Sequence, residues 1–128
     1  MKKRSRTRKG SSLAESAVAA IVLIPIALAI LDLIVLVSAN TMNDTTAKNA
    51  ARAAANQANE TQAELAVQNS LSTFHKSSII TGIDVALQYT LEQVTCTSTM
   101  NVHLPVPFPG FSDFVFKAKD VEPVIAQK

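Results

Sequence analysis

The chain has 128 residues, 48% of them hydrophobic, which allows one small domain plus a segment of another kind. The net charge of +2 is misleading, because the first ten residues hold six of the twelve basic residues and leave six basic against ten acidic ones, a formal −4, in the rest. Those six are scattered, which argues against a nucleic-acid-binding body. A single cysteine, Cys96, excludes an intramolecular disulfide.

A long apolar segment follows the basic leader. Residues 17–31 carry no charge, and the 23 residues 17–39, at about 1.5 Å each, can cross roughly 30 Å of hydrocarbon. The preceding basic cluster predicts a cytoplasmic N-terminus and an extracytoplasmic body. Val37-Ser38-Ala39 matches a signal-peptidase site only loosely, so a span that stays in the chain is favoured over a secretory signal that is cut off after it.

The boundary between leader and span has a recognisable pattern. Gly10 ends the basic stretch, Ser11 follows, and Glu15 lies five residues after the glycine. This resembles the type IV prepilin motif, which implies that a membrane aspartyl peptidase cuts after Gly10. Such pilins usually have an aromatic residue after the acid, whereas this chain has Ser16. The resemblance implies that Glu15 sets the register between subunits by pairing with the new amino terminus of a neighbour; the alternative is an acid that only reaches back to water.

Two further residues stand out within the span. Pro25 lacks a backbone N–H and is expected to kink the helix. Asp32 lies 17 positions after Glu15, about 100° round the helix, so one face cannot serve both acids. Asp32 is expected either to face the headgroups or to contact a partner helix.

An alanine-rich stretch follows a short polar segment. Residues 47–58 contain seven alanines, and alanine has the highest helix propensity. The helix is therefore predicted to continue to about Asn59, with a break at residues 43–46 left open.

The order of these features resembles the TadE-like family, pseudopilins of the tight-adherence (Flp-type) pilus machinery. The resemblance is carried by the Gly10–Glu15 start, Pro25, Asp32 and the signature Ala51-Arg52-Ala53, although the family often has glycine where Ala51 stands. It implies a bacterial inner-membrane location and four partners: other pilins or pseudopilins, the pilus assembly platform, prepilin peptidase and membrane lipid.

The remaining residues predict a small α+β body. Thr61 and Glu64 form a capping box for a helix over residues 62–75, with an apolar stripe at Ala63, Val67, Leu71 and Phe74. The period then changes to two, predicting strands over residues 83–91, 93–104 and 113–121, with a proline-bearing loop between the last two. The predicted parts are a leader (1–10), a transmembrane helix (11–39), a helical stalk (40–60) and an extracytoplasmic domain (61–128), in which one helix covers a three-stranded antiparallel sheet.

No catalytic motif occurs in the sequence, and no activity or cofactor is expected. His75, His103 and Cys96 lack the spacing of metal ligands. Phe108 and Phe111 either face a partner or close the core. The sequence thus predicts a minor pseudopilin without catalytic activity, cleaved after Gly10 and packed through its N-terminal helix. The alternative is an uncleaved, single-pass anchored binding module.

Overall fold

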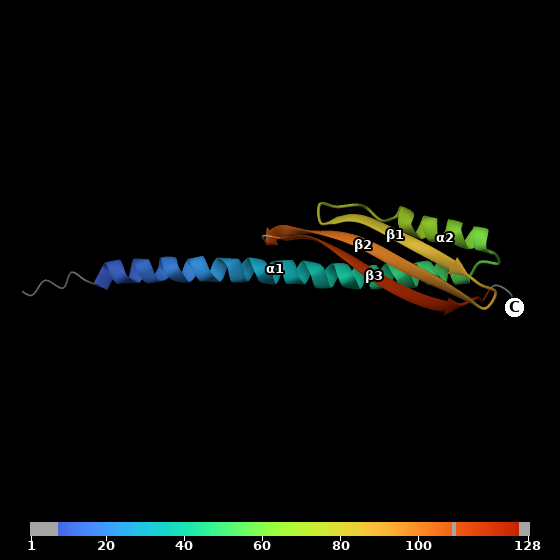
Figure 1. Ribbon diagram of the computed structural model, residues 1–128, viewed down its shortest axis with the longest axis horizontal. Helices are drawn as coiled ribbons and strands as arrows, with labels where there is room; N and C mark the ends of the chain where they lie inside the picture. Colours follow the sequence, from blue (N-terminus) through green and yellow to red (C-terminus); the bar gives the residue numbers. More distant parts are fainter. Residues whose placement is uncertain (1–7, 109, 126–128) are drawn as a thin grey trace, which may run out of the picture.

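The computed structural model describes residues 8–108 and 110–125, which form two helices and a three-stranded sheet. In chain order the elements are α1 (Arg8–Ala55), α2 (Glu60–Ser72), β1 (Ile80–Tyr89), β2 (Gln93–Phe108) and β3 (Phe111–Pro123). α1 is a long rod, and the sheet lies along its C-terminal half while the N-terminal half stands bare (Figure 1). The predicted α+β class is confirmed.

α1 is a single unbroken helix. Its 48 residues extend about 72 Å at 1.5 Å per residue. The break left open at residues 43–46 is not present. The hydroxyls of Thr41, Thr45 and Thr46 each donate to the carbonyl four residues earlier, at 3.0, 2.9 and 2.9 Å. The polar segment therefore satisfies its hydroxyls within the helix instead of interrupting it.

The C-terminal end of α1 is set by distant parts of the chain. The helix ends at Ala55 and not near Asn59. The Ala55 carbonyl accepts from the N–H of Ile125 at 3.0 Å, and the Gln57 carbonyl accepts from the hydroxyl of Tyr89 at 2.9 Å. Ile125 thus satisfies a carbonyl that the helix end leaves without a partner, and Tyr89 holds the segment that follows the helix.

α2 begins two residues earlier than predicted. Its N-cap is Asn59, whose side chain accepts from the Gln62 N–H at 2.9 Å. The predicted capping box led by Thr61 is therefore wrong, because asparagine is among the best N-cap residues and comes first in the chain. The helix ends at Ser72 and not at His75. Its buried residues, Ala63 and Val67, belong to the predicted apolar stripe.

The sheet is antiparallel with the order β1-β2-β3, and its predicted alternation is confirmed. From Val94 to Leu104 the inward side chains of the central strand are buried: Val94, Cys96, Ser98, Met100, Val102 and Leu104. On β3, Phe116 is half-buried and Ala118 buried, whereas Lys117 and Lys119 are exposed on the outer face. Leu91, predicted within the first strand, instead lies in the β1–β2 turn and is 75% exposed.

Both helices cover the inner face of the sheet. One core cluster joins four alanines of α1 to residues of α2 and β2: Ala50, Ala51, Ala54, Ala55, Ala63, Val67, Val94 and Cys96. A second cluster joins Ala39 of α1 to Ile80, Met100 and Val102. Small side chains let α1 lie close to its neighbours. Residues 40–55, most of the predicted stalk (40–60), therefore form the central helix of the sheet domain.

The β2–β3 hairpin is longer than predicted and ends irregularly. His103 pairs with Asp113 and Phe108 with Phe111, so four residues of β2 lie opposite Ser112 alone. This bulge contains prolines, which cannot donate to the ladder. Gly110 has φ 92°, a conformation that glycine adopts readily. The hairpin end points along α1 toward its bare half (Figure 1).

Candidate membrane and assembly site

The N-terminal half of α1 is an uncovered apolar rod. Every residue from Ser12 to Ala27 is exposed, and only 6% of the most apolar 18-residue window of the helix is buried. This stretch is therefore not a core helix of the sheet domain. A window of 18 residues covers about 27 Å, close to the roughly 30 Å of a hydrocarbon core. α1 is long and apolar enough to cross a membrane.

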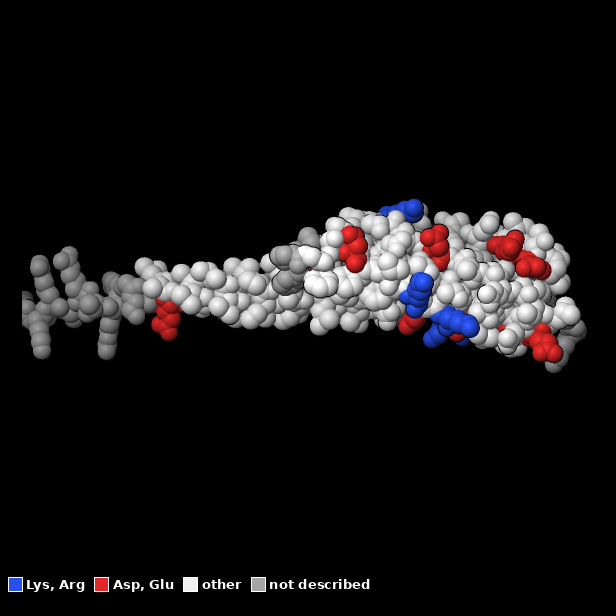
Figure 2. Space-filling model, viewed as in Figure 1, with Lys and Arg blue, Asp and Glu red and all other residues white. Residues whose placement is uncertain are grey.

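One acidic side chain interrupts this rod. Figure 2 shows a single acidic patch near its start, and the sequence assigns it to Glu15, which is exposed. The neighbouring Ser16 hydroxyl donates to the Ser12 carbonyl at 2.8 Å, so it is satisfied within the helix. The backbone of Gly10 and Ser11 lies in the first turns of α1, and cleavage between them stays a prediction.

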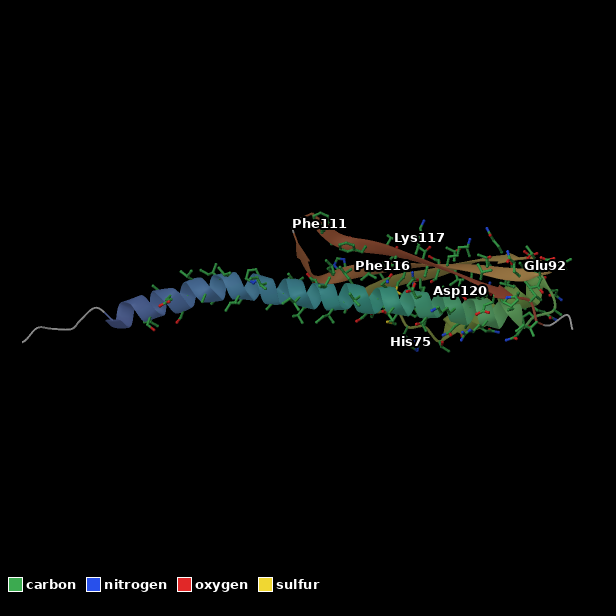
Figure 3. The ribbon with its side chains drawn as sticks, turned by 90° about the horizontal axis from the view of Figure 1, so that it is seen from below. His75, Glu92, Phe111, Phe116, Lys117 and Asp120 are labelled. Carbon is green, nitrogen blue, oxygen red and sulfur yellow. The ribbon has the colours of Figure 1, made fainter. Side chains whose placement is uncertain are left out.

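Pro25 lies within α1, with helix on both sides. Without an N–H, it cannot donate to the carbonyl of Ile21. The helix nevertheless continues, and Figure 3 shows a gentle curve without interruption. The predicted kink at Pro25 therefore does not interrupt the helix.

Asp32 lies in surroundings that differ from both sequence expectations. It is only 4% exposed, and neither carboxylate oxygen has a hydrogen-bond partner among the described residues. The side chain is buried within its own chain, and three residues farther along α1 Val35 packs against the cluster that contains Val102 of β2. It therefore does not face open solvent or present a free surface to a partner helix.

The signature Ala51-Arg52-Ala53 has a structural role. Ala51 is fully buried in the core, and Ala53 is half-buried. Arg52 points outward, and its Nε lies 3.3 Å from a carboxylate oxygen of Glu122 on β3. An exposed pair of this kind contributes about 0–1 kcal/mol. The small residue lets the helix lie close to the sheet, and the arginine ties the helix to the edge strand.

Sequence reasoning missed a buried polar contact between α1 and the sheet. Asn43 and Ser98 are both fully buried. The Ser98 hydroxyl donates to Asn43 Oδ1 at 2.6 Å, and Asn43 Nδ2 donates to the Ser98 carbonyl at 3.4 Å. The only sequence signal was an asparagine inside a helix that continues through it. This contact fixes the position of α1 against the central strand.

A second missed contact lies near the hairpin end. His103 Nδ1 is 2.8 Å from Asp113 Oδ1, and the Ser112 hydroxyl donates to Asp113 Oδ2 at 2.7 Å. The hydrogen bond from His103, followed by that from Ser112, lowers the pKa of Asp113 below its ordinary value. This pair joins the two strands on the outer face.

The three residues considered as metal ligands do not converge. Cys96 is buried on the inner face of the sheet, His103 lies on the outer face, and His75 is exposed after α2. Burial, followed by the charge of Asp120, raises the pKa of the Cys96 thiol to about 11. Cys96 is therefore a small core side chain with little nucleophilic character. The described part of the chain contains no group of three potential metal ligands.

Comparison of the chain with known protein families, with curated proteins and with solved structures finds no match. The resemblance to TadE-like pseudopilins therefore rests on the pattern of residues between Gly10 and Ala55 alone.

Proposed function

We propose that the chain is a minor pseudopilin of a tight-adherence (Flp-type) pilus system, held in a bacterial inner membrane by α1. The observation that carries this proposal is the bare apolar rod with one exposed acid near its start. Because residues 12–27 are all exposed, this stretch needs lipid or other helices around it. The sheet domain would lie outside the cytoplasm, as the basic leader indicates.

Glu15 supplies the proposed register. A carboxylate is disfavoured beside hydrocarbon unless a cation neutralises it. Cleavage after Gly10 would free the α-amino group of Ser11 in each copy, four residues from Glu15. Copies of α1 inserted in one direction place these groups at similar depths, so a small axial stagger brings the amine of one copy to the acid of the next. Cleavage would also remove six positive charges that would repel one another in a helix bundle.

The function is structural in this proposal. The chain would contact other pilins, the assembly platform and prepilin peptidase, and would catalyse no reaction itself. α1 contacts the sheet through Asn43 with Ser98 and through Arg52 with Glu122. These two contacts support a rigid unit in which the sheet domain moves together with the helix.

The intact mass of the membrane-fraction protein tests the processing step. We expect loss of the first ten residues in cells with a prepilin peptidase, full length in cells without it, and full length for Gly10→Leu in both. A chain that keeps Met1 in every strain would overturn the proposal and favour an uncleaved, anchored binding module.

Glu15→Gln tests the register role, with Glu64→Gln as its matched control, because Glu64 is an exposed acid on α2. We expect both variants to be cleaved, and only Glu15→Gln to fail to co-purify with the pilus machinery. Normal incorporation of Glu15→Gln would remove the register role while leaving the cleavage intact.

A further inference from the structure

The end of the β2–β3 hairpin lies beside α1 where the bare part of the rod stops. Leu28 and Ala29 are the first residues of α1 that are partly covered, and Asp32 is the first that is buried. Farther along the helix, Val35 packs in the same cluster as Val102 of β2. Figure 1 shows the hairpin end over this part of α1. The sheet domain therefore reaches down to the helix turn that contains Leu28.

The lengths of β2 and α1 place the hairpin end at the same position along α1. At the far end of the sheet, adjacent residues of the C-terminal chain donate one hydrogen bond to Glu92 and the next to Ala55. From Glu92, the twelve residues to Leu104 extend about 40 Å as a strand, which equals about 26 residues of helix. Counted back from Ala55, this places Leu104 between Leu28 and Asp32.

If α1 spans a membrane, the part of α1 beside the hairpin end lies inside the hydrocarbon core. A hydrocarbon core of about 30 Å requires about 20 helical residues, but among the side chains that the structure describes the uninterrupted exposed run of α1 is the 16 residues Ser12–Ala27. A core that begins at Leu13 ends near Asp32, and one that begins at Ala17 ends near Leu36. Tilt of the helix would lengthen the stretch required. In each case the hairpin end lies within the hydrocarbon core, on the cytoplasmic side of its outer boundary.

The chemistry of the hairpin end suits such a place. The sequence from Leu104 to Ser112 has no charged residue. Pro105 is exposed, and Phe111 is 65% exposed. Figure 3 shows Phe111 at the end of the hairpin, pointing away from α1. Proline brings no N–H that would need a partner in lipid, and phenylalanine is among the side chains that favour insertion into hydrocarbon.

We propose that the partner of this surface is lipid: the hairpin end enters the extracytoplasmic leaflet beside α1, with Pro105 and Phe111 among the acyl chains. The proposal rests on the membrane span proposed for α1. It also gives Asp32 a physical explanation, because the hairpin separates from lipid a carboxylate that is costly at this depth. The His103–Asp113 pair, the next pair along the hairpin, then lies toward the headgroups.

Single tryptophans test this proposal in the full chain, which contains no native tryptophan. The probe is Phe111→Trp in phosphatidylcholine vesicles that contain lipids with a nitroxide on the acyl chain near the headgroup. Leu23→Trp reports the span, and Leu91→Trp reports the far end of the sheet domain. Val115→Trp is the matched control, because Val115 lies on the same strand and face, is 60% exposed, and is about 13 Å farther from the hairpin end.

We expect the lipid nitroxide to quench Phe111→Trp several-fold more strongly than Val115→Trp or Leu91→Trp, with emission at shorter wavelength. Aqueous acrylamide should show the reverse order. If Phe111→Trp matches Leu91→Trp while Leu23→Trp is quenched by lipid, the span stands and the hairpin proposal is wrong. If Leu23→Trp is not quenched by lipid either, the span fails and both proposals fall. Protection of Phe111→Trp from both quenchers would show that protein covers it, which also overturns contact with lipid.

Discussion

The contact between Asn43 and Ser98 allows the packing of α1 on the sheet to be measured directly. Asn43→Ala removes the 2.6 Å and 3.4 Å hydrogen bonds and leaves the Ser98 hydroxyl without its acceptor in the core. Each lost hydrogen bond reduces stability by about 1 kcal/mol, and the unsatisfied buried hydroxyl costs about 1–3 kcal/mol. Allowing for overlap between these terms, we expect Asn43→Ala to lower the free energy of unfolding by about 2–4 kcal/mol.

The partner variant makes this expectation specific. Ser98→Ala removes the shorter bond and leaves Asn43 Oδ1 unsatisfied, which should cost about 1–3 kcal/mol. The double variant removes both polar groups at once. It should therefore be less destabilised than the sum of the two single variants by about 1–2 kcal/mol, within the range that contacting residues show in double-mutant cycles.

The assay is equilibrium unfolding by urea of the full chain in mild detergent micelles. The apolar half of α1 is expected to stay helical in the micelle, so helix content is a poor probe. Tyr89 is the single tyrosine of a chain without tryptophan, and its hydroxyl bonds the Gln57 carbonyl, so its fluorescence reports the sheet domain. Asn40→Ala is the control, because Asn40 is exposed on the same helix and should change stability by less than about 0.5 kcal/mol.

Two results would refute the reasoning. Asn43→Ala could prove as mild as Asn40→Ala, which would mean that the buried contact does not hold α1 in place. Alternatively, the losses in the Asn43 and Ser98 single variants could simply add in the double variant, which would mean that the two side chains do not interact.

Three further predictions concern buried or paired acids. In Asp32→Leu, an apolar group with the same number of heavy atoms replaces a buried carboxylate that lacks a partner among the described residues. This variant should raise the free energy of unfolding by about 1–3 kcal/mol. A loss of stability would show that the carboxylate has a favourable partner. The Cys96 pKa is raised from 9.0 to about 11, so the folded state resists ionisation of the thiol, and this contribution to stability should be lost as the pH rises from 9.0 to about 11. Cys96→Ala should flatten that part of the pH–stability curve. An unchanged curve would contradict the burial of the thiol. The pKa of Asp113 is lowered by its hydrogen bonds, so its contribution is present above the ordinary pKa of 3.8 and lost as the pH falls through the folded-state value; His103→Ala should raise the Asp113 pKa measured by carboxyl NMR titration, and an unmoved pKa would mean that the pair is not formed.

The periodicity of the sequence is sufficient to predict most of the fold. Ala63 and Val67 lie on one helical face, and the alternation in β1 and β3 places apolar side chains on the inner face of the sheet. These patterns are local, since they record which side of an element is apolar. The apolar length of α1 and the position of Glu15 within it also follow from sequence order alone, whereas the part of α1 that stays uncovered does not.

Tertiary structure decides where elements end and what their polar residues do. α1 stops at Ala55 because Tyr89 and Ile125 supply hydrogen bonds to its last turn and the segment that follows. Asn43 is accommodated inside a helix because Ser98, 55 residues later in the chain, satisfies its side chain. These partners are remote in sequence, so no local pattern predicts them.

Asp32 shows the same division at the candidate site. The sequence by itself determines that one acid follows a long apolar run. Only the packing of the sheet domain along this part of α1 decides that this acid is buried and not exposed. The physical reason is that a local pattern gives the polarity of a side chain, whereas its burial depends on which distant element lies over it.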